Sequence, residues 1–421
     1  MRKILILFSL VTQAGLAQQD TLTLLECYNR VVEVHPITGN KTLLEGITAL
    51  KLKNYSAAFY PMFNLYAQAT YQSDVTSLEV DLPLPDVEFP HPTKDQYKIA
   101  MDINQVLYDG GATRNRKELE KQQLETDLQK TEVTLHQLRE SVNTLYFSIL
   151  MLQEQEKILK LTDEVITERI KVARSSVENG VMMSSDLLAL QAEQVKLKQQ
   201  RTATAAGMKS GFNMLGGLLE MDLDRHVALE FPVIGIDPDK GIGRPEILLF
   251  KSQISQIEKS GDLLRSSRLP KLYAFGQVGY GRPGLNMLSE TFEPYYLIGA
   301  RISWNPFDWK VNRREQQVLE LQYQQVNNQL DAFNLSVETE LEKYRSDILK
   351  YEELIRSDDT LIELRSRIVE SSTSKFDNGI INSADYLVDL NEEKQAKINR
   401  EIHRIRMIQA QAEYLIKTGN Q

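Results

Sequence analysis

The sequence is poor in the residues that build most enzyme sites. Its 421 residues include one cysteine, Cys27, so no disulfide can form within the chain. The five histidines are scattered, without the spacing of a zinc site. No G-x-S-x-G sequence, P-loop or glycine-rich dinucleotide fingerprint is present. We therefore expect no catalytic residue, no metal site and no cofactor, and the chain is not predicted to be an enzyme.

A surplus of positive charge is missing too. Lysine and arginine total 49 against 58 aspartates and glutamates, which gives a formal net charge of −9. The two signs are interspersed, whereas nucleic-acid-binding proteins gather Lys and Arg into stripes. Paired charges at helical spacing are instead typical of solvated helix faces. We expect no nucleic-acid partner.

Long apolar runs are absent after residue 17. No later stretch approaches the ~18 consecutive apolar residues that a membrane-spanning helix requires. Residues 1–17 begin with Arg2 and Lys3, continue with an apolar run and end with small residues up to Ala17. This order is that of a secretory signal peptide, so we predict that residues 1–17 are removed on export.

The remaining chain contains an internal repeat. Tyr97–Ile103 resembles Tyr296–Ile302, and Val177–Gly180 resembles Phe376–Gly379. Four aspartates follow these segments at matching places: Asp109, Asp308, Asp186 and Asp385. All these pairs share an offset of 199, and chance would not hold that register over about 90 residues. The pattern indicates a duplicated chain.

An earlier block repeats at an offset of 209, because Pro36 to Pro61 and Pro245 to Pro270 each enclose 24 residues of helical pattern. The ten-residue difference between the offsets falls in a loop between two strands, which we predict to be longer in the first half, at about 76–93. We predict a first structural repeat over 18–218, a linker over 219–244 and a second repeat over 245–421.

Two stretches lack both proline and glycine, from about 113 to 177 and from about 312 to 376. Apolar residues recur in both at steps of 3 and 4, which is a heptad pattern typical of coiled coils. As helices, each would span roughly 95–100 Å. We predict long helical hairpins over about 110–218 and 309–418.

Four shorter segments alternate apolar and polar residues as strands do. They lie at about 61–76, 95–107, 270–282 and 294–304, with aromatic residues near their ends. Such strands suit an outer-membrane barrel with an aromatic belt, and strands of a soluble sandwich remain the alternative. Four strands cannot close a barrel, and open edges cannot be satisfied in hydrocarbon. If these strands enter a membrane, several chains must combine them.

These features together resemble the TolC family of outer-membrane efflux proteins. Val106–Arg114 is similar to the family's turn between strand and helix, with Asn305–Lys310 as its partner. The segments Asn179–Leu188 and Asn378–Leu387 are similar to the family's helical turns at the periplasmic end. The resemblance covers nearly the whole chain after the signal peptide, and the order and spacing of the motifs make it specific.

The resemblance implies a homotrimer with a 12-stranded barrel in the outer membrane of a Gram-negative bacterium. A twelve-helix tunnel would continue the barrel through the periplasm, with residues 219–244 as an equatorial linker. The implied function is the exit duct of a tripartite efflux pump or type I secretion system, with a periplasmic adaptor protein and an inner-membrane pump as partners. The alternative is a periplasmic coiled-coil scaffold without a pore that binds envelope proteins.

We predict site residues at the turns from strand to helix, at the helical tips and at the tunnel entrance. Asp109 and Asp308 are predicted caps of the long helices, because a carboxylate there accepts bonds from free N–H groups. Gly110 and Gly111 allow the turn into the first helix, and we expect the second turn to differ because Trp309 and Lys310 replace the glycines. Asn179, Gly180, Asn378 and Gly379 are predicted helix ends, and the resemblance makes these tips the place where an adaptor docks. A helix–turn–helix without a partner remains open.

The resemblance also indicates a gate at the tunnel entrance. Asp385 matches the aspartate that narrows the family's entrance, and a trimer would repeat it as an acidic ring able to select cations. Asp186, its counterpart in the first repeat, is the second candidate. Val388 and Ile381 stand where a known member of the family has an aspartate and an arginine, so closure must use other contacts. Asp385 as a simple helix cap remains an alternative.

Overall fold

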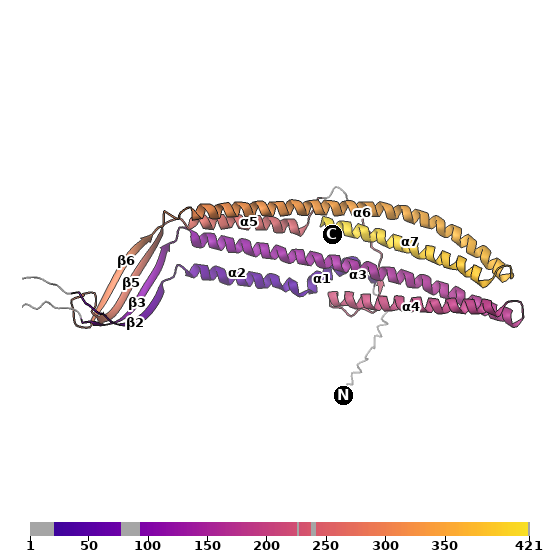
Figure 1. Ribbon diagram of the computed structural model, residues 1–421, viewed down its shortest axis with the longest axis horizontal. Coiled ribbons are helices and arrows are strands. Elements are labelled where there is room, and N and C mark those ends of the chain that lie inside the picture. The colour runs from indigo at the N-terminus through magenta and orange to yellow at the C-terminus, as the bar shows by residue number, and fades with distance from the viewer. Residues whose placement is uncertain (1–20, 77–92, 225–226, 237–240, 420–421) are drawn as a thin grey trace, which may run out of the picture. The chain divides into compact units, whose positions relative to one another are not determined.

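The computed structural model describes residues 21–76, 93–224, 227–236 and 241–419 (Figure 1). The predicted signal peptide and most of the predicted loop at 76–93 lie outside this range. The chain forms two compact units. The sheet unit comprises residues 40–130 and 246–331, and the hairpin unit comprises residues 1–39, 131–245 and 332–421.

The sheet unit contains a four-stranded antiparallel sheet. Its strands are β2 (Met62–Tyr71), β3 (Asp95–Tyr108), β5 (Lys271–Arg282) and β6 (Glu293–Ser303), hydrogen-bonded in the order β2-β3-β5-β6. Helix α2 (Asn40–Ala57) leads into β2, and α5 (Pro245–Ser266) leads into β5. The strands lie close to the predicted ranges, except that the first ends at Tyr71 instead of about residue 76. The two outer strands, β2 and β6, leave the sheet with two free edges.

The alternation of residue types gives the sheet two different faces. In register, Phe63 lies opposite Ile103 and Leu65 opposite Met101. This apolar face carries exposed large side chains from all four strands: Phe63, Leu65, Tyr71, Tyr97, Ile99, Val278, Tyr280, Tyr296, Ile298 and Ile302. The opposite, polar face carries Asn64, Gln68, Lys98, Asp102, Gln277 and Arg301. A soluble sheet buries its apolar face, whereas this one exposes it.

The hairpin unit is helical. The long helices α3 (Ala112–Glu178) and α6 (Val311–Asp377) begin in the sheet unit and end here, and each contains 67 residues. Each is followed by a returning helix, α4 (Ser184–Leu219) and α7 (Ser383–Thr418). Figure 1 shows α3 beside α4 and α6 beside α7. The heptad pattern predicted this pairing of long helices.

A core of buried apolar side chains holds the hairpin unit together around α1 (Leu24–Val34). Cys27 and Val31 of α1 are fully buried in this core with Tyr146 and Phe212. A two-stranded parallel ladder joins β1 (Thr21–Leu22) to β4 (Ala228–Leu229), which lies in the 219–244 segment. The Tyr146 hydroxyl lies 2.8 Å from the carbonyl oxygen of Leu22 and 2.7 Å from that of Glu230, and its single hydrogen bonds one or the other, which ties this ladder to α3.

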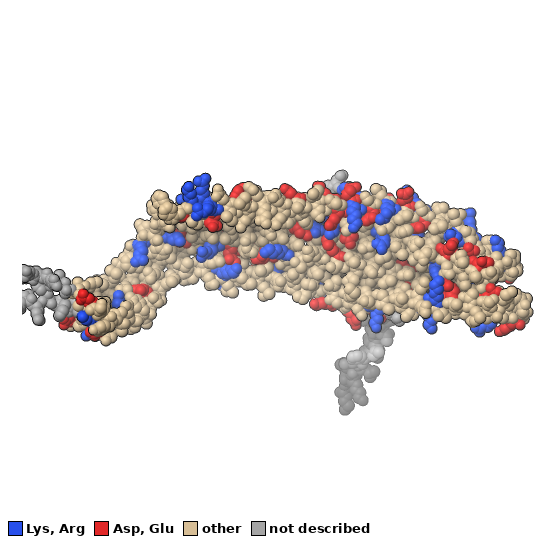
Figure 2. Space-filling view, in the orientation of Figure 1, with Lys and Arg blue, Asp and Glu red and all other residues tan. Residues whose placement is uncertain are grey.

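The fold class is as predicted: mainly helical, with duplicated strand pairs and long paired helices. Within the described residues, no helix is both long enough and apolar enough to span a membrane. Figure 2 shows acidic and basic side chains interspersed over the visible helical surface, while most of the visible surface over the strands carries no charge.

Candidate channel wall and helical tips

A carboxylate cap marks the turn from β3 into α3. Asp109 accepts hydrogen bonds from the N–H groups of Gly111 (2.9 Å) and Thr113 (2.6 Å). Gly110 and Gly111 have positive φ angles of 72° and 83°. A Cβ on Gly110 would lie 2.7 Å from the Cβ of Leu269, whereas a Cβ on Gly111 would meet nothing within 4 Å. Gly110 is therefore required for close approach as well as for its backbone angle.

The second turn was expected to differ, and that expectation is wrong. Trp309 and Lys310 have φ angles of 53° and 64°, so they adopt the left-handed conformation of the two glycines. Asp308 accepts bonds from the N–H groups of Lys310 (3.0 Å) and Asn312 (3.0 Å), which is the bonding pattern of Asp109. The Asp308 carboxylate thus stabilises the same turn although Trp309 and Lys310 disfavour positive φ angles, which cost about 1–2 kcal/mol of conformational free energy for each residue.

The two helical tips share one hydrogen-bonding pattern. Gly180 and Gly379 end α3 and α6 with φ angles of 75° and 70°. The side-chain amide of Asn179 donates to the Ser175 carbonyl, and that of Asn378 donates to the Ser374 carbonyl: these distances are 2.8 and 2.7 Å. Each of these carbonyl groups also accepts the backbone N–H of the same asparagine, so the side chain adds a second bond at the helix end. The tips are therefore sharp, rigid reversals with apolar side chains exposed around them: Val181, Met183, Leu188, Ile380 and Val388.

The two gate candidates occupy different environments. Asp385 lies exposed in the first turn of α7, where its N–H donates to the Asn382 side chain at 2.9 Å. Asn382 is therefore the residue that caps α7. Asp186 instead accepts bonds at one oxygen from the N–H (2.9 Å) and hydroxyl (2.8 Å) of Ser383. Asp186 thus joins α4 to the start of α7, while Asp385 presents its carboxylate to solvent.

Sequence reasoning missed the other contacts between the two hairpins. Arg169 of α3 makes two hydrogen bonds to the Asp377 carboxylate at 2.7 and 3.0 Å. Within the second hairpin, Phe376 of α6 stacks on Tyr386 of α7 with 5.1 Å between ring centroids. No sequence signal could pair Arg169 with Asp377, because 208 residues separate them and many equivalent charges lie on each helix.

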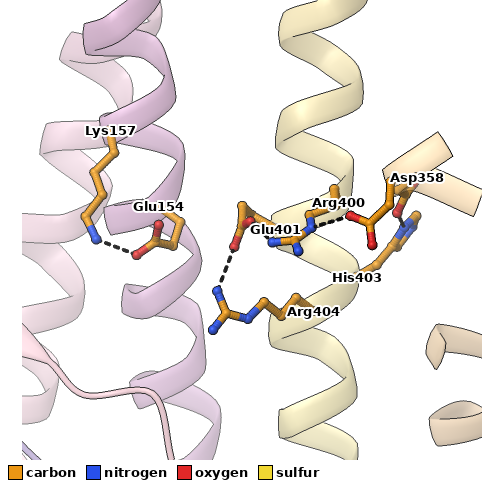
Figure 3. A network of polar contacts seen from close by, with 8 residues as sticks. Glu154, Lys157, Asp358, Arg400, Glu401, His403 and Arg404 are labelled. Atoms are coloured by element: carbon orange, nitrogen blue, oxygen red, sulfur yellow. Dashed lines mark hydrogen bonds and ion pairs between the residues drawn. The ribbon is translucent and has the colours of Figure 1, made fainter. Parts of the chain in front are cut away.

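A network of polar contacts links α7 to α6 in the hairpin unit (Figure 3). His403 and Arg400 of α7 face α6, where Nδ1 of His403 lies 2.6 Å from Asp358 and Arg400 bonds Asp359 at 3.1 Å. Glu401 and Arg404 lie on the other side of α7, 3.5 Å apart as an ion pair. The contacts from His403 and Arg400 join α7 to α6, so this network is a structural link between these two helices.

A second, partly buried polar cluster shifts the pKa values of two carboxyl groups. The side-chain amide of Asn143 donates to Glu413 at 2.7 Å and accepts from the Tyr28 hydroxyl at 2.8 Å. Burial raises the pKa of Glu413. Burial acts in the same direction on Glu140, but hydrogen bonds and charge from Lys417 and Arg244 outweigh it and lower the pKa of Glu140. The pKa of Glu413 therefore lies above that of an ordinary glutamate, and the pKa of its neighbour Glu140 lies below it.

Comparison with known proteins gives a family match over part of the chain and a fold match over most of it. Residues 53–209 match the family model described as outer membrane efflux protein. The fold is similar to that of the outer membrane protein VceC of Vibrio cholerae, with 13% identity, TM-score 0.68 and coverage of 94% of this chain and 96% of VceC. It is also similar to the outer membrane channel CmeC of Campylobacter jejuni: 14% identity, TM-score 0.67, coverage 94% and 85%.

The open-state outer membrane channel MtrE of Neisseria gonorrhoeae gives 13% identity and TM-score 0.67, with coverage of 94% of this chain and 88% of MtrE. No curated protein matches the chain. The family match over residues 53–209 agrees with the resemblance inferred from the motifs, and over 94% of the chain the fold is similar to that of these outer membrane proteins.

Proposed function

We propose that this chain, which carries an outer membrane efflux protein domain on a channel fold, is the exit duct of a tripartite efflux pump or type I secretion system. The observation that carries the proposal is the sheet with an exposed apolar face and two free edges. Unpaired edges are not tolerated in hydrocarbon, so such a sheet enters a membrane only within a closed barrel. Three copies would supply twelve strands.

Each segment of the chain then has a distinct role. The signal peptide (1–17) directs export, and the repeats over 18–218 and 245–421 each supply a strand pair and a helical hairpin. The 219–244 linker joins them; its strand β4 pairs with β1 at the start of the first repeat. Asp109 and Asp308 cap the helices where each barrel strand becomes a tunnel helix. The duct is passive, and an inner-membrane pump supplies the energy.

The tips are the proposed docking place for a periplasmic adaptor protein. Around Asn179–Gly180 and Asn378–Gly379, exposed apolar side chains stand on backbone turns that are fixed by hydrogen bonds. Exposed apolar groups on a rigid tip favour a partner that buries them. Asp385, exposed beside the second tip, would form the acidic ring at the entrance of a trimer.

The test is the mass of the mature protein extracted from membranes in mild detergent, measured by light scattering and corrected for bound detergent. We expect a trimer that requires detergent and conducts ions in planar bilayers. Asp385→Ala should then weaken the cation preference at low salt, with the neighbouring Ala384→Ser as the control. A monomer that is soluble without detergent would contradict the channel and support the periplasmic scaffold.

A further inference from the structure

The polar face of the sheet contains a lysine that is held by side chains from the other three strands. Lys98 lies on β3, and its ammonium nitrogen is 3.3 Å from the side-chain oxygen of Gln277 on β5. The same nitrogen lies 5.2 Å from the ring centroid of Tyr295 on β6 and 5.9 Å from that of Tyr66 on β2. Aromatic faces attract cations at such distances. The charge is therefore fixed in place above the sheet.

The Gln277 amide connects this lysine to a carboxylate. Its oxygen faces Lys98, and its nitrogen donates to Asp102 at 2.6 Å and to the Tyr66 hydroxyl at 3.1 Å. Because both ends of the amide are engaged, its orientation is set by the charges on either side. Gln277 acts as a positioning residue that holds a positive and a negative group at a fixed spacing.

A glycine makes room for the aromatic part of this arrangement. Gly279 lies opposite Tyr295 in the ladder, and a Cβ at Gly279 would lie 2.4 Å from the Tyr295 ring. The ring therefore lies flat over the glycine and is only 8% exposed. Four strands thus build one ordered polar cluster, in contrast to the exposed apolar side chains on the opposite face.

The orientation of the two sheet faces decides whether the polar cluster faces lipid or the lumen of the barrel. Lys98 and Asp102 alternate along β3 with Ile99 and Met101, which lie on the apolar face. In a barrel surrounded by lipid, the apolar face is outside and the polar face lines the lumen. The cluster then lies on the pore wall within the membrane, and a trimer repeats it three times.

We propose that Lys98 and Asp102 form a fixed charge pair on the wall of the barrel, and that each charge biases the passage of charged solutes through the outer membrane, in opposite directions. Lys98 attracts the anionic groups of solutes and Asp102 the cationic groups. The proposal rests on the proposed channel function. It adds a selectivity site that is separate from the tips of the helices.

The test is the reversal potential of single channels in a KCl gradient at low salt, where charges on the wall are screened least. Lys98→Gln should shift the K⁺/Cl⁻ permeability ratio toward cations by about fourfold, because a unit charge ~10 Å away in water changes the occupancy of each ion about twofold and in opposite directions. Asp102→Asn should shift it toward anions, and the asparagine oxygen still accepts the bond from Gln277. Lys98→Arg keeps the charge and should leave the ratio near that of the wild type.

A further control removes a positive charge from the other face. Arg282, which lies opposite Tyr97 on the apolar face, pairs with Asp95, and Arg282→Gln should leave the permeability ratio unchanged. Opposite shifts in the Lys98→Gln and Asp102→Asn channels support the charge pair. Unchanged ratios, or shifts of one sign in both, overturn it. A wild-type protein that forms no conducting trimer would instead contradict the proposed function.

Discussion

At the scale of single residues, the turns between strand and helix show that bonding pattern overrides residue preference. Gly110 and Gly111 adopt positive φ angles at little cost, whereas Trp309 and Lys310 adopt the same angles at a cost. The shared feature is the aspartate, which accepts two backbone bonds in each turn. The caps could be predicted from the sequence, but the shape of the second turn could not, because composition alone suggested another bend.

The two glycines separate two causes of strain. We expect Gly110→Ala to destabilise the protein by about 2 kcal/mol or more, because the new Cβ both adopts a positive φ and meets Leu269. Gly111→Ala is the matched control, since its Cβ enters open space and only the backbone term of about 1–2 kcal/mol applies. Thermal unfolding in detergent measures both. Equal losses in the two variants would show that contact with Leu269 is unimportant.

The buried carboxyl groups predict a dependence on pH. Burial raises the folded-state pKa of Glu413, because the buried group favours its protonated form. The folded protein is therefore most stable below the unfolded-state pKa of Glu413, and it loses stability as pH rises through the folded-state pKa. We expect Glu413→Gln to raise the unfolding temperature at pH 8 and to change it little at pH 4. The glutamine oxygen still accepts the bond from Asn143.

Glu140 provides the control of opposite sign. Its folded-state pKa is lowered, so its contribution is present above the unfolded-state pKa and is lost as pH falls through the folded-state pKa. Glu140→Gln should lower the unfolding temperature at pH 8, with a loss of about 1–3 kcal/mol for weakening hydrogen bonds to charged groups. The same pH profile in both variants would refute the assignment of the two shifts.

At the scale of elements, the residue pattern within a segment predicted the helices and strands that the segment forms. The absence of proline and glycine marked the long helices, and alternation of residue types marked the strands and their faces. The β1–β4 ladder escaped prediction because each strand has two residues, too few to show alternation. The bond from Ser383 to Asp186 also escaped, because it joins residues 197 positions apart. Contacts between hairpins depend on packing, which the residue pattern of one helix does not encode.

This limit affects the candidate site directly. Asp186 and Asp385 occupy equivalent places in the two repeats, and both were gate candidates, with Asp385 first because it matches the family's entrance aspartate. The structure gives them different surroundings: Asp186 holds the first residue of α7, and Asp385 faces solvent. Duplicated sequence therefore produced two positions with different contacts. Of the two, Asp385 is the better candidate for a charged entrance, because its carboxylate is exposed.

At the scale of the whole molecule, the arrangement of polarity on the sheet indicates what surrounds it. Water-soluble proteins pack an apolar sheet face against a core, yet here that face is exposed along all four strands. The free edges of β2 and β6 are a second unsatisfied feature. A barrel made from several copies satisfies both, since lipid covers the apolar face and neighbouring copies pair the edges.

Two neighbouring residues of β6 test which face meets lipid. Ile298 lies on the apolar face and is 79% exposed, while Leu297 lies on the polar face and is 46% exposed. We expect Ile298→Lys to destabilise the membrane-inserted trimer by about 2–4 kcal/mol, because a charge at mid-membrane depth loses its hydration. Leu297→Lys adds the same charge to the face that lines the proposed lumen and should assemble nearly as well as the wild type.

The measurement is the fraction of detergent-extracted protein that remains trimeric as temperature rises. Loss confined to Ile298→Lys places lipid against the apolar face and water against the polar face, which is the orientation that the Lys98–Asp102 pair requires. Loss confined to Leu297→Lys would reverse the two faces and remove the charge pair from the pore. Equal tolerance of both lysines would mean that neither face meets hydrocarbon, and the sheet would then belong to a soluble scaffold.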